Sequence, residues 1–144
     1  MLLVVAIAIQ YVVTVYAVTM RTRIQVFRRH FMKQFAAEHE KAFPGQKLPE
    51  FGYPDCGNGY YGKRLAYADW YRMNNAQRVQ GNFLEQITFI TGVSIVAALA
   101  YPWYAMYLFV AYQVGRLIFS VCYSSGGPNT RIFGALLMDL AIFT

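Results

Sequence analysis

The sequence predicts an all-α integral membrane protein, a four-helix bundle whose fourth helix is short. Two observations lead to this prediction. Of the 144 residues, 57% are hydrophobic and only 14% are charged, whereas soluble domains carry about 25% charged residues. The charges are also unevenly placed, because eleven of the thirteen Lys and Arg residues lie between Arg21 and Arg78. The apolar segments that flank this charged region suit a lipid environment.

The first apolar run covers residues 2–20 and is interrupted by Gln10, Thr14 and Thr19. At about 1.5 Å per residue, a helix of this length crosses a hydrocarbon core of about 30 Å. A cleaved signal peptide is the competing interpretation. The run is long for a signal peptide, it lacks a basic region before it, and no small-residue cleavage site follows, so the sequence favours a true span.

A basic segment, residues 21–33, follows this run directly. Short loops rich in Arg and Lys stay on the cytoplasmic side, which predicts that residues 21–68 face the cytosol. Apolar residues at helical spacing predict that the first helix continues to residue 35. In one interpretation these cations set topology and contact lipid phosphates, and in the other they bind a ligand. The basic excess lies beside a span and does not indicate nucleic-acid binding.

The remainder of the chain divides into a loop and three further helices of a single membrane domain, residues 1–144. Pro and Gly residues predict a loop over residues 43–68, after which Asp69 can cap a new helix. The predicted helices cover residues 2–35, 69–99, 103–123 and 131–144. The last has fourteen residues, whereas a straight span needs about twenty.

Ionisable residues lie within these predicted spans. Arg78, Asn82 and Glu85 are spaced by four and three residues, which places them in one stripe on a helix. Arg116 and Tyr123 form a similar stripe on the third helix. Such groups are costly in lipid and normally face a bundle interior, where they pair or line a cavity. Pairing among the charged residues is one interpretation, but the surplus of N–H and O–H donors favours a bound anion that carries carboxylates.

The segment Arg78-Val-Gln-Gly-Asn82-Phe-Leu-Glu85 resembles the Arg-x-x-x-Asn-x-x-Glu signature of the MAPEG family, the membrane-associated proteins in eicosanoid and glutathione metabolism. The resemblance continues in residues 115–123, Gly-Arg-Leu-Ile-Phe-Ser-Val-Cys-Tyr, and in residues 128–135, Pro-Asn-Thr-Arg-Ile-Phe-Gly-Ala. Within the family, the chain is most similar to the type-three branch of microsomal glutathione S-transferases.

This resemblance implies a homotrimer of four-helix subunits that binds glutathione, as co-substrate, between subunits near the cytosolic face. It implies a glutathione transferase or glutathione peroxidase that acts on lipophilic electrophiles or lipid hydroperoxides. No metal is expected, because the sequence has no Cys/His cluster with metal-binding spacing. The implied glutathione ligands are Arg78, Gln80, Asn82, Glu85, Arg116 and Tyr123. Arg131 would lie by the sulfur as the catalytic residue, because a guanidinium at a helix N-terminus favours the reactive thiolate. In the alternative interpretation, Arg131 is only an anchor at the membrane interface.

Phe119 stands where many active relatives have Tyr, so one hydroxyl group is missing from the implied site. Together with the short last helix, this supports an alternative function, a non-catalytic MAPEG-like scaffold subunit of a larger membrane protein complex. The sequence leans toward the enzyme. By resemblance, the membrane is that of the endoplasmic reticulum or the mitochondrion.

Overall fold

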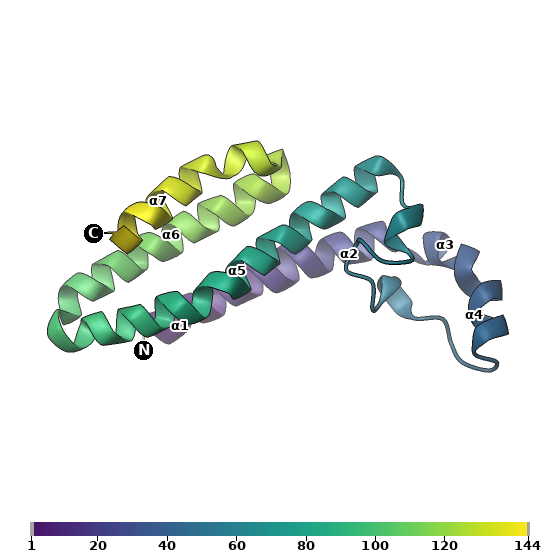
Figure 1. Ribbon diagram of the computed structural model, residues 1–144, viewed down its shortest axis with the longest axis horizontal. Coiled ribbons are helices and arrows are strands. Elements are labelled where there is room, and N and C mark those ends of the chain that lie inside the picture. The colour runs from purple at the N-terminus through teal and green to yellow at the C-terminus, as the bar shows by residue number, and fades with distance from the viewer. Residues whose placement is uncertain (1, 144) are drawn as a thin grey trace.

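The computed structural model describes residues 2–143, which form helices and connecting segments without β-strands in that range. Three of the helical stretches are long and apolar enough to cross a membrane, namely Val4–Val26, Tyr67–Ala100 and Pro102–Gly126. They run side by side along the long axis of the molecule (Figure 1). The predicted all-α membrane fold is therefore confirmed.

The first long stretch is one rod made of three consecutive elements, α1 (Leu2–Tyr11), the π-helical segment η1 (Val12–Met20) and α2 (Arg21–Val26). The rod ends at Phe27, whose backbone angles of φ −91° and ψ 51° are not helical. Short helices follow at an angle to it (Figure 1): α3 (Arg29–Met32), η2 (Lys33–Phe35) and α4 (Ala36–Ala42). The predicted continuous helix over residues 2–35 is thus wrong beyond Val26.

The reason for this break lies in the packing of Phe27. Its side chain is completely buried and rests on Gly52, where a Cβ atom would come within 2.5 Å of the ring. The surrounding core consists of Val26, Phe27, Met32, Phe35 and Met73. Burying these side chains against the following segment outweighs the helical hydrogen bonds that are interrupted at the break, because each large apolar side chain contributes about 1.5–3 kcal/mol when buried.

The predicted loop is a packed structure that contains the short helices η3 (Glu50–Gly52) and η4 (Gly62–Arg64). Asp55 organises it, because its carboxylate accepts hydrogen bonds from the backbone N–H groups of Gly57, Gly59 and Gly62 at 2.7, 2.9 and 2.7 Å. Arg23 of α2 donates a hydrogen bond of 2.6 Å to the Asp55 carbonyl oxygen. The loop is therefore attached to the end of the first rod.

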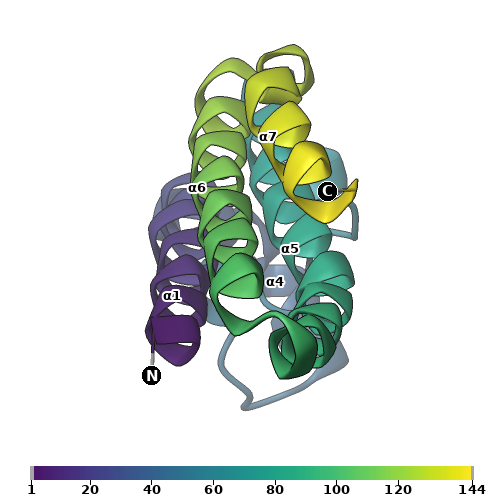
Figure 2. The ribbon, with the colours of Figure 1, turned by 90° about the vertical axis from the view of Figure 1, so that its left-hand side faces the viewer.

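Helix α5 (Tyr67–Ala100) leads back along the rod, and α6 (Pro102–Gly126) returns beside it. Asp69 lies in the first turn of α5, and the N-cap is Ala66 with no side-chain cap hydrogen bond, so Asp69 is not the predicted cap. The turn η5 (Pro128–Arg131) leads into α7 (Ile132–Phe143). Helix α6 lies between α1 and α7 (Figure 2). Gly115 and Gly134 allow α6 and α7 to approach closely.

A surface cluster on the loop side predicts a pH-dependent contact. The Tyr60 hydroxyl donates a hydrogen bond of 2.7 Å to Glu38, and Arg64 forms an ion pair of 3.1 Å with the same carboxylate. The Tyr60 hydrogen bond, followed by Arg64, lowers the pKa of Glu38. The lowered pKa means that ionised Glu38 stabilises the folded state at pH values above the ordinary glutamate pKa of about 4.3. This stabilisation is lost as the pH falls through the lowered pKa that Glu38 has in the folded protein.

Replacing Tyr60 with Phe should therefore raise the pKa of Glu38 toward its ordinary value, because the largest stabilising contact of the carboxylate is removed. An NMR titration of labelled glutamate carboxyl carbons measures this pKa directly. Tyr53→Phe is the matched control, since Tyr53 packs on Arg23 instead. An unchanged Glu38 pKa in Tyr60→Phe would contradict the assignment.

Candidate functional site

Arg116 lies inside the bundle, where α5 and α6 pack together. Its side chain is only 1% exposed. One guanidinium nitrogen donates to Gln86 Oε1 at 3.3 Å and the other to the Val79 carbonyl oxygen at 3.3 Å. The guanidinium also lies 4.8 Å from the ring centre of Phe119. Contacts with neutral acceptors and an aromatic face hold this cation in place.

No carboxylate within residues 2–143 lies at ion-pair distance from Arg116, and Glu85 acts on its charge only from farther away. Within residues 2–143 the ion pairs are Arg64–Glu38 and Arg72–Asp69. The Nε atom of Arg116 is buried without a hydrogen-bond partner. A buried cation that lacks a counter-charge is costly and attracts an anion. Pairing of Arg116 with Glu85, the simpler interpretation of the sequence, is not found in the described chain.

Tyr123 and Arg131 extend this cluster toward the η5 turn. The Tyr123 ring is buried and lies 5.5 Å from that of Phe119. The guanidinium of Arg131 lies 5.6 Å from the centre of the Tyr123 ring. Thr130 fixes the turn, because its hydroxyl group donates to the carbonyl oxygens of Cys122 and Gly127 at 2.6 and 2.9 Å. The fold therefore connects Arg116, Tyr123 and Arg131 through a row of aromatic rings.

The predicted stripe on α5 lies on the outside of the single chain. Arg78 and Glu85 are exposed, while Asn82 and Gln80 are half-buried. Arg78 donates to Asn82 Oδ1 at 3.5 Å, as expected for side chains one helical turn apart. The structure therefore separates the predicted site residues: Arg116 and Tyr123 are buried on α6, Arg131 is exposed at η5, and the other four lie exposed or half-buried on α5.

Two hydrogen bonds fix the depth of the external stripe relative to the first rod. Thr19 donates to the Ala76 carbonyl oxygen at 3.1 Å, and Arg72 donates to Gln25 at 3.0 Å. Thr19 belongs to the first apolar span, so Ala76 lies at the edge of the hydrocarbon layer. Arg78, Asn82 and Glu85 follow about 3, 9 and 14 Å deeper, at 1.5 Å per residue.

Charged groups at this depth are rarely exposed to lipid, because the cost is several kcal/mol at the centre of a bilayer. The exposed side chains of Arg78 and Glu85 therefore indicate that another protein surface or a water-filled cavity covers this face of α5. A single chain provides neither for these two residues. The stripe is thus a polar face at bilayer depth that the described chain leaves uncovered at Arg78 and Glu85.

Sequence reasoning missed the acceptor that holds Arg116. Gln86 accepts hydrogen bonds from both Arg116 and the Tyr112 hydroxyl group, the latter at 3.0 Å. A signal existed, because Gln86 shares its helical face with the buried residues Val79, Phe83 and Ile90. A second buried polar cluster was also missed, in which Gln10 donates to Thr14 and Ser120.

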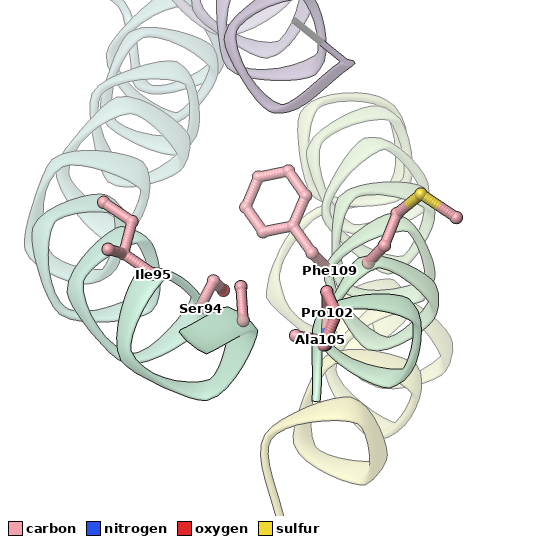
Figure 3. A pocket seen from close by; sticks show the side chains of 7 residues that line it. Ser94, Ile95, Pro102, Ala105 and Phe109 are labelled. Atoms are coloured by element: carbon pink, nitrogen blue, oxygen red, sulfur yellow. The ribbon is translucent and has the colours of Figure 1, made fainter. Parts of the chain in front are cut away.

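Apolar cavities lie at the opposite end of α5 and α6. One has a volume of about 180 Å³ and is bounded by Ser94 and Ile95 on α5 and by Pro102, Ala105 and Phe109 on α6 (Figure 3). Another of about 360 Å³ lies beside it and extends from Tyr101 to Tyr112. Their linings suit hydrocarbon. They lie away from the stripe of Arg78, Asn82 and Glu85.

The fold and the site define a multi-pass helical membrane protein that carries cationic and amide groups at bilayer depth. The chain belongs to the MAPEG family, whose family model matches residues 1–144, the whole chain. Comparisons with curated proteins and with solved structures gave no match. Proteins of this family act at membranes in glutathione and eicosanoid metabolism, and they generally bind glutathione and lipophilic substrates.

Proposed function

We propose that the protein is a membrane-bound glutathione transferase and peroxidase, which activates the glutathione thiol for attack on lipophilic electrophiles or lipid hydroperoxides. One observation carries this proposal beyond family membership. Two cations lie at bilayer depth without an ion pair among residues 2–143, since Arg116 is buried and Arg78 is exposed on α5. An anionic tripeptide satisfies such a set of donors.

In this proposal a neighbouring copy covers the α5 stripe, and glutathione lies between copies of a homotrimer. Arg78, Arg116 and Asn82 supply donors for its carboxylates, with Gln80 and Tyr123 at the margins. Glu85 accepts from its amino group. The membrane is that of the endoplasmic reticulum or the mitochondrion, and residues 21–68 face the cytosol, as the basic segment after the first span favours.

Arg131 is the proposed catalytic residue. It lies where α7 begins and packs against Tyr123, so its full charge adds to the partial positive charge of the helix N-terminus. Both effects lower the pKa of a nearby thiol, whose ordinary value is about 8.5. The resulting thiolate forms a C–S bond with an electrophilic carbon as the leaving group departs with the bonding electrons.

For a lipid hydroperoxide, the thiolate attacks the terminal oxygen and the O–O bond breaks. The lipid alkoxide takes a proton to become an alcohol, and a second glutathione displaces water from the sulfenic acid to give glutathione disulfide. Two glutathione molecules are thus oxidised while one hydroperoxide is reduced. The chain needs to supply only binding, orientation and stabilisation of the thiolate for either reaction.

The test uses purified full-length protein in detergent with intact oligomers. Glutathione should produce thiolate absorbance at neutral pH, and chlorodinitrobenzene or a fatty-acid hydroperoxide should yield the conjugate or glutathione disulfide. Denatured protein is the control. An intact oligomer that neither ionises glutathione nor turns over any electrophile would contradict the enzymatic function.

One observation favours the scaffold alternative instead. Phe119 occupies the position against Arg116 and lacks the hydroxyl group of many active relatives. Purification of a single copy together with unrelated membrane subunits, in place of a homotrimer, would support a scaffold. The composition of the purified complex therefore distinguishes the enzyme from the scaffold before any activity is measured.

A further inference from the structure

A groove lies on the loop side of the molecule, away from the proposed glutathione site. It has a volume of about 240 Å³ and forms between the α3–η2–α4 segment and the segment that leads into η3. Its lining residues are Arg29, Met32, Lys33, Ala36, Leu48, Pro49, Glu50 and Phe51. The floor is therefore mostly apolar, and charged side chains stand at the rim.

Two cations belong to this rim. Arg29 and Lys33 are four residues apart, one helical turn, and both side chains are exposed. Within residues 2–143 neither forms an ion pair. Arg28 and His30 are exposed beside them, and residues 21–33 contain no acidic residue. Glu50 is the one acidic group among the lining residues, so the groove has a net positive rim.

The hydrogen bonds of Arg23 fix the level of the groove relative to the membrane. Arg23 donates to the carbonyl oxygens of Phe51 and Asp55 at 3.3 and 2.6 Å, so the wall formed by Phe51 lies beside Arg23. Arg23 is three residues past Met20, the last residue of the apolar run, or about 5 Å along a helix. Headgroup layers extend roughly 5–8 Å beyond each side of the hydrocarbon core. The groove therefore lies at headgroup level.

We propose that this groove binds the headgroup of an anionic phospholipid. The lipid phosphate lies between the Arg29 guanidinium and the Lys33 ammonium groups, and the glycerol region packs on Met32, Leu48 and Pro49. Juxtamembrane cations attract anionic lipids, and the apolar floor favours a lipid over a free phosphate. Glu50 disfavours additional negative charge at its side of the rim. The site is independent of glutathione chemistry.

The experiment measures lipid retention by native mass spectrometry on the full-length protein in detergent. Phosphatidylserine and phosphatidylcholine with identical acyl chains are added in parallel. Phosphatidylserine should bind more tightly than phosphatidylcholine. Each removed cation should weaken phosphatidylserine binding about fivefold, so the double variant Arg29→Gln with Lys33→Gln should weaken it roughly twenty-five-fold. Glu50→Gln should strengthen it severalfold, because it removes the one repulsive carboxylate.

Lys41→Gln with Lys63→Gln is the matched control, since both lysines are exposed and neither lines the groove. This variant has the same net charge as the test variant and should retain phosphatidylserine like the original protein. Millimolar inorganic phosphate should not displace the lipid. The proposal is overturned if the two lipids bind equally, if the control loses as much affinity as the test variant, or if free phosphate competes effectively.

Discussion

Replacing Arg131 with Gln is expected to reduce the rate of glutathione conjugation at neutral pH by about tenfold to thirtyfold. The reason is electrostatic, since the thiol pKa returns toward its ordinary value of about 8.5 when the guanidinium is removed, and at pH 7 a thiol with that pKa is only about 3% ionised. The variant should keep its fold, because Arg131 is exposed and contacts the chain through the Tyr123 ring. Initial rates with chlorodinitrobenzene measure the effect.

The pH profile distinguishes this role from a structural one. In Arg131→Gln the rate should recover as the pH rises toward about 8.5, where glutathione ionises without assistance. Arg131→Lys should retain part of the activity, because it keeps the charge. Arg28→Gln, which removes an exposed cation on the loop side, should behave like the original protein. A uniform loss at every pH would show that Arg131 does not act on the thiol.

The second large effect is expected from Gly134→Ala, which should separate α7 from α6. A Cβ atom at Gly134 would lie 2.4 and 2.6 Å from the backbone nitrogen and Cα of Phe119 and 2.7 Å from the Gly115 carbonyl oxygen. Backbone atoms cannot move aside as a flexible side chain can. Overpacking of this kind costs about 1–3 kcal/mol, and more where the backbone must shift. Thermal unfolding in detergent should show a clear decrease in midpoint.

Gly92→Ala is the matched control for this substitution. It also adds one methyl group to a glycine within a long helix, but apart from the neighbouring residues and backbone of its own helix no described atom lies within 4 Å of the new Cβ. Because alanine favours helices by up to about 1 kcal/mol over glycine, this variant should be as stable as the original protein or more stable. Equal stability of the two variants would mean that α6 and α7 do not pack as described.

Hydropathy predicted the three long spans because lipid leaves the backbone no alternative to helices. The end of the first helix was predicted wrongly for a physical reason. Phe27, Phe31 and Phe35 recur at helical spacing, but Phe27 packs on Gly52, a residue that local periodicity cannot relate to it. The ordered structure of the loop was not predicted either. Asp55 organises it through three backbone N–H groups that come together only when the loop folds.

The charged members of the candidate site are the easiest to predict from sequence. Charges in apolar helices are conspicuous, so the spacing of Arg78, Glu85 and Arg116 led to the prediction of a site there. Gln86 was not, because an amide carries no charge and its importance comes from accepting hydrogen bonds across helices from Tyr112 and Arg116. Within one chain the α5 stripe and the interior cluster are separate, since Arg78 is exposed and Arg116 is buried.

The central claim is that the α5 stripe and the interior donors bind glutathione together in the assembled protein. Isothermal titration calorimetry, with glutathione added to the purified oligomer, tests this claim most directly. The variants Arg78→Gln and Arg28→Gln are titrated in parallel. We predict saturable binding that Arg78→Gln weakens about tenfold or more, as expected for a lost hydrogen bond to a charged group, and that Arg28→Gln leaves unchanged. An intact oligomer that takes up no glutathione, or that binds it equally well without Arg78, would contradict the claim.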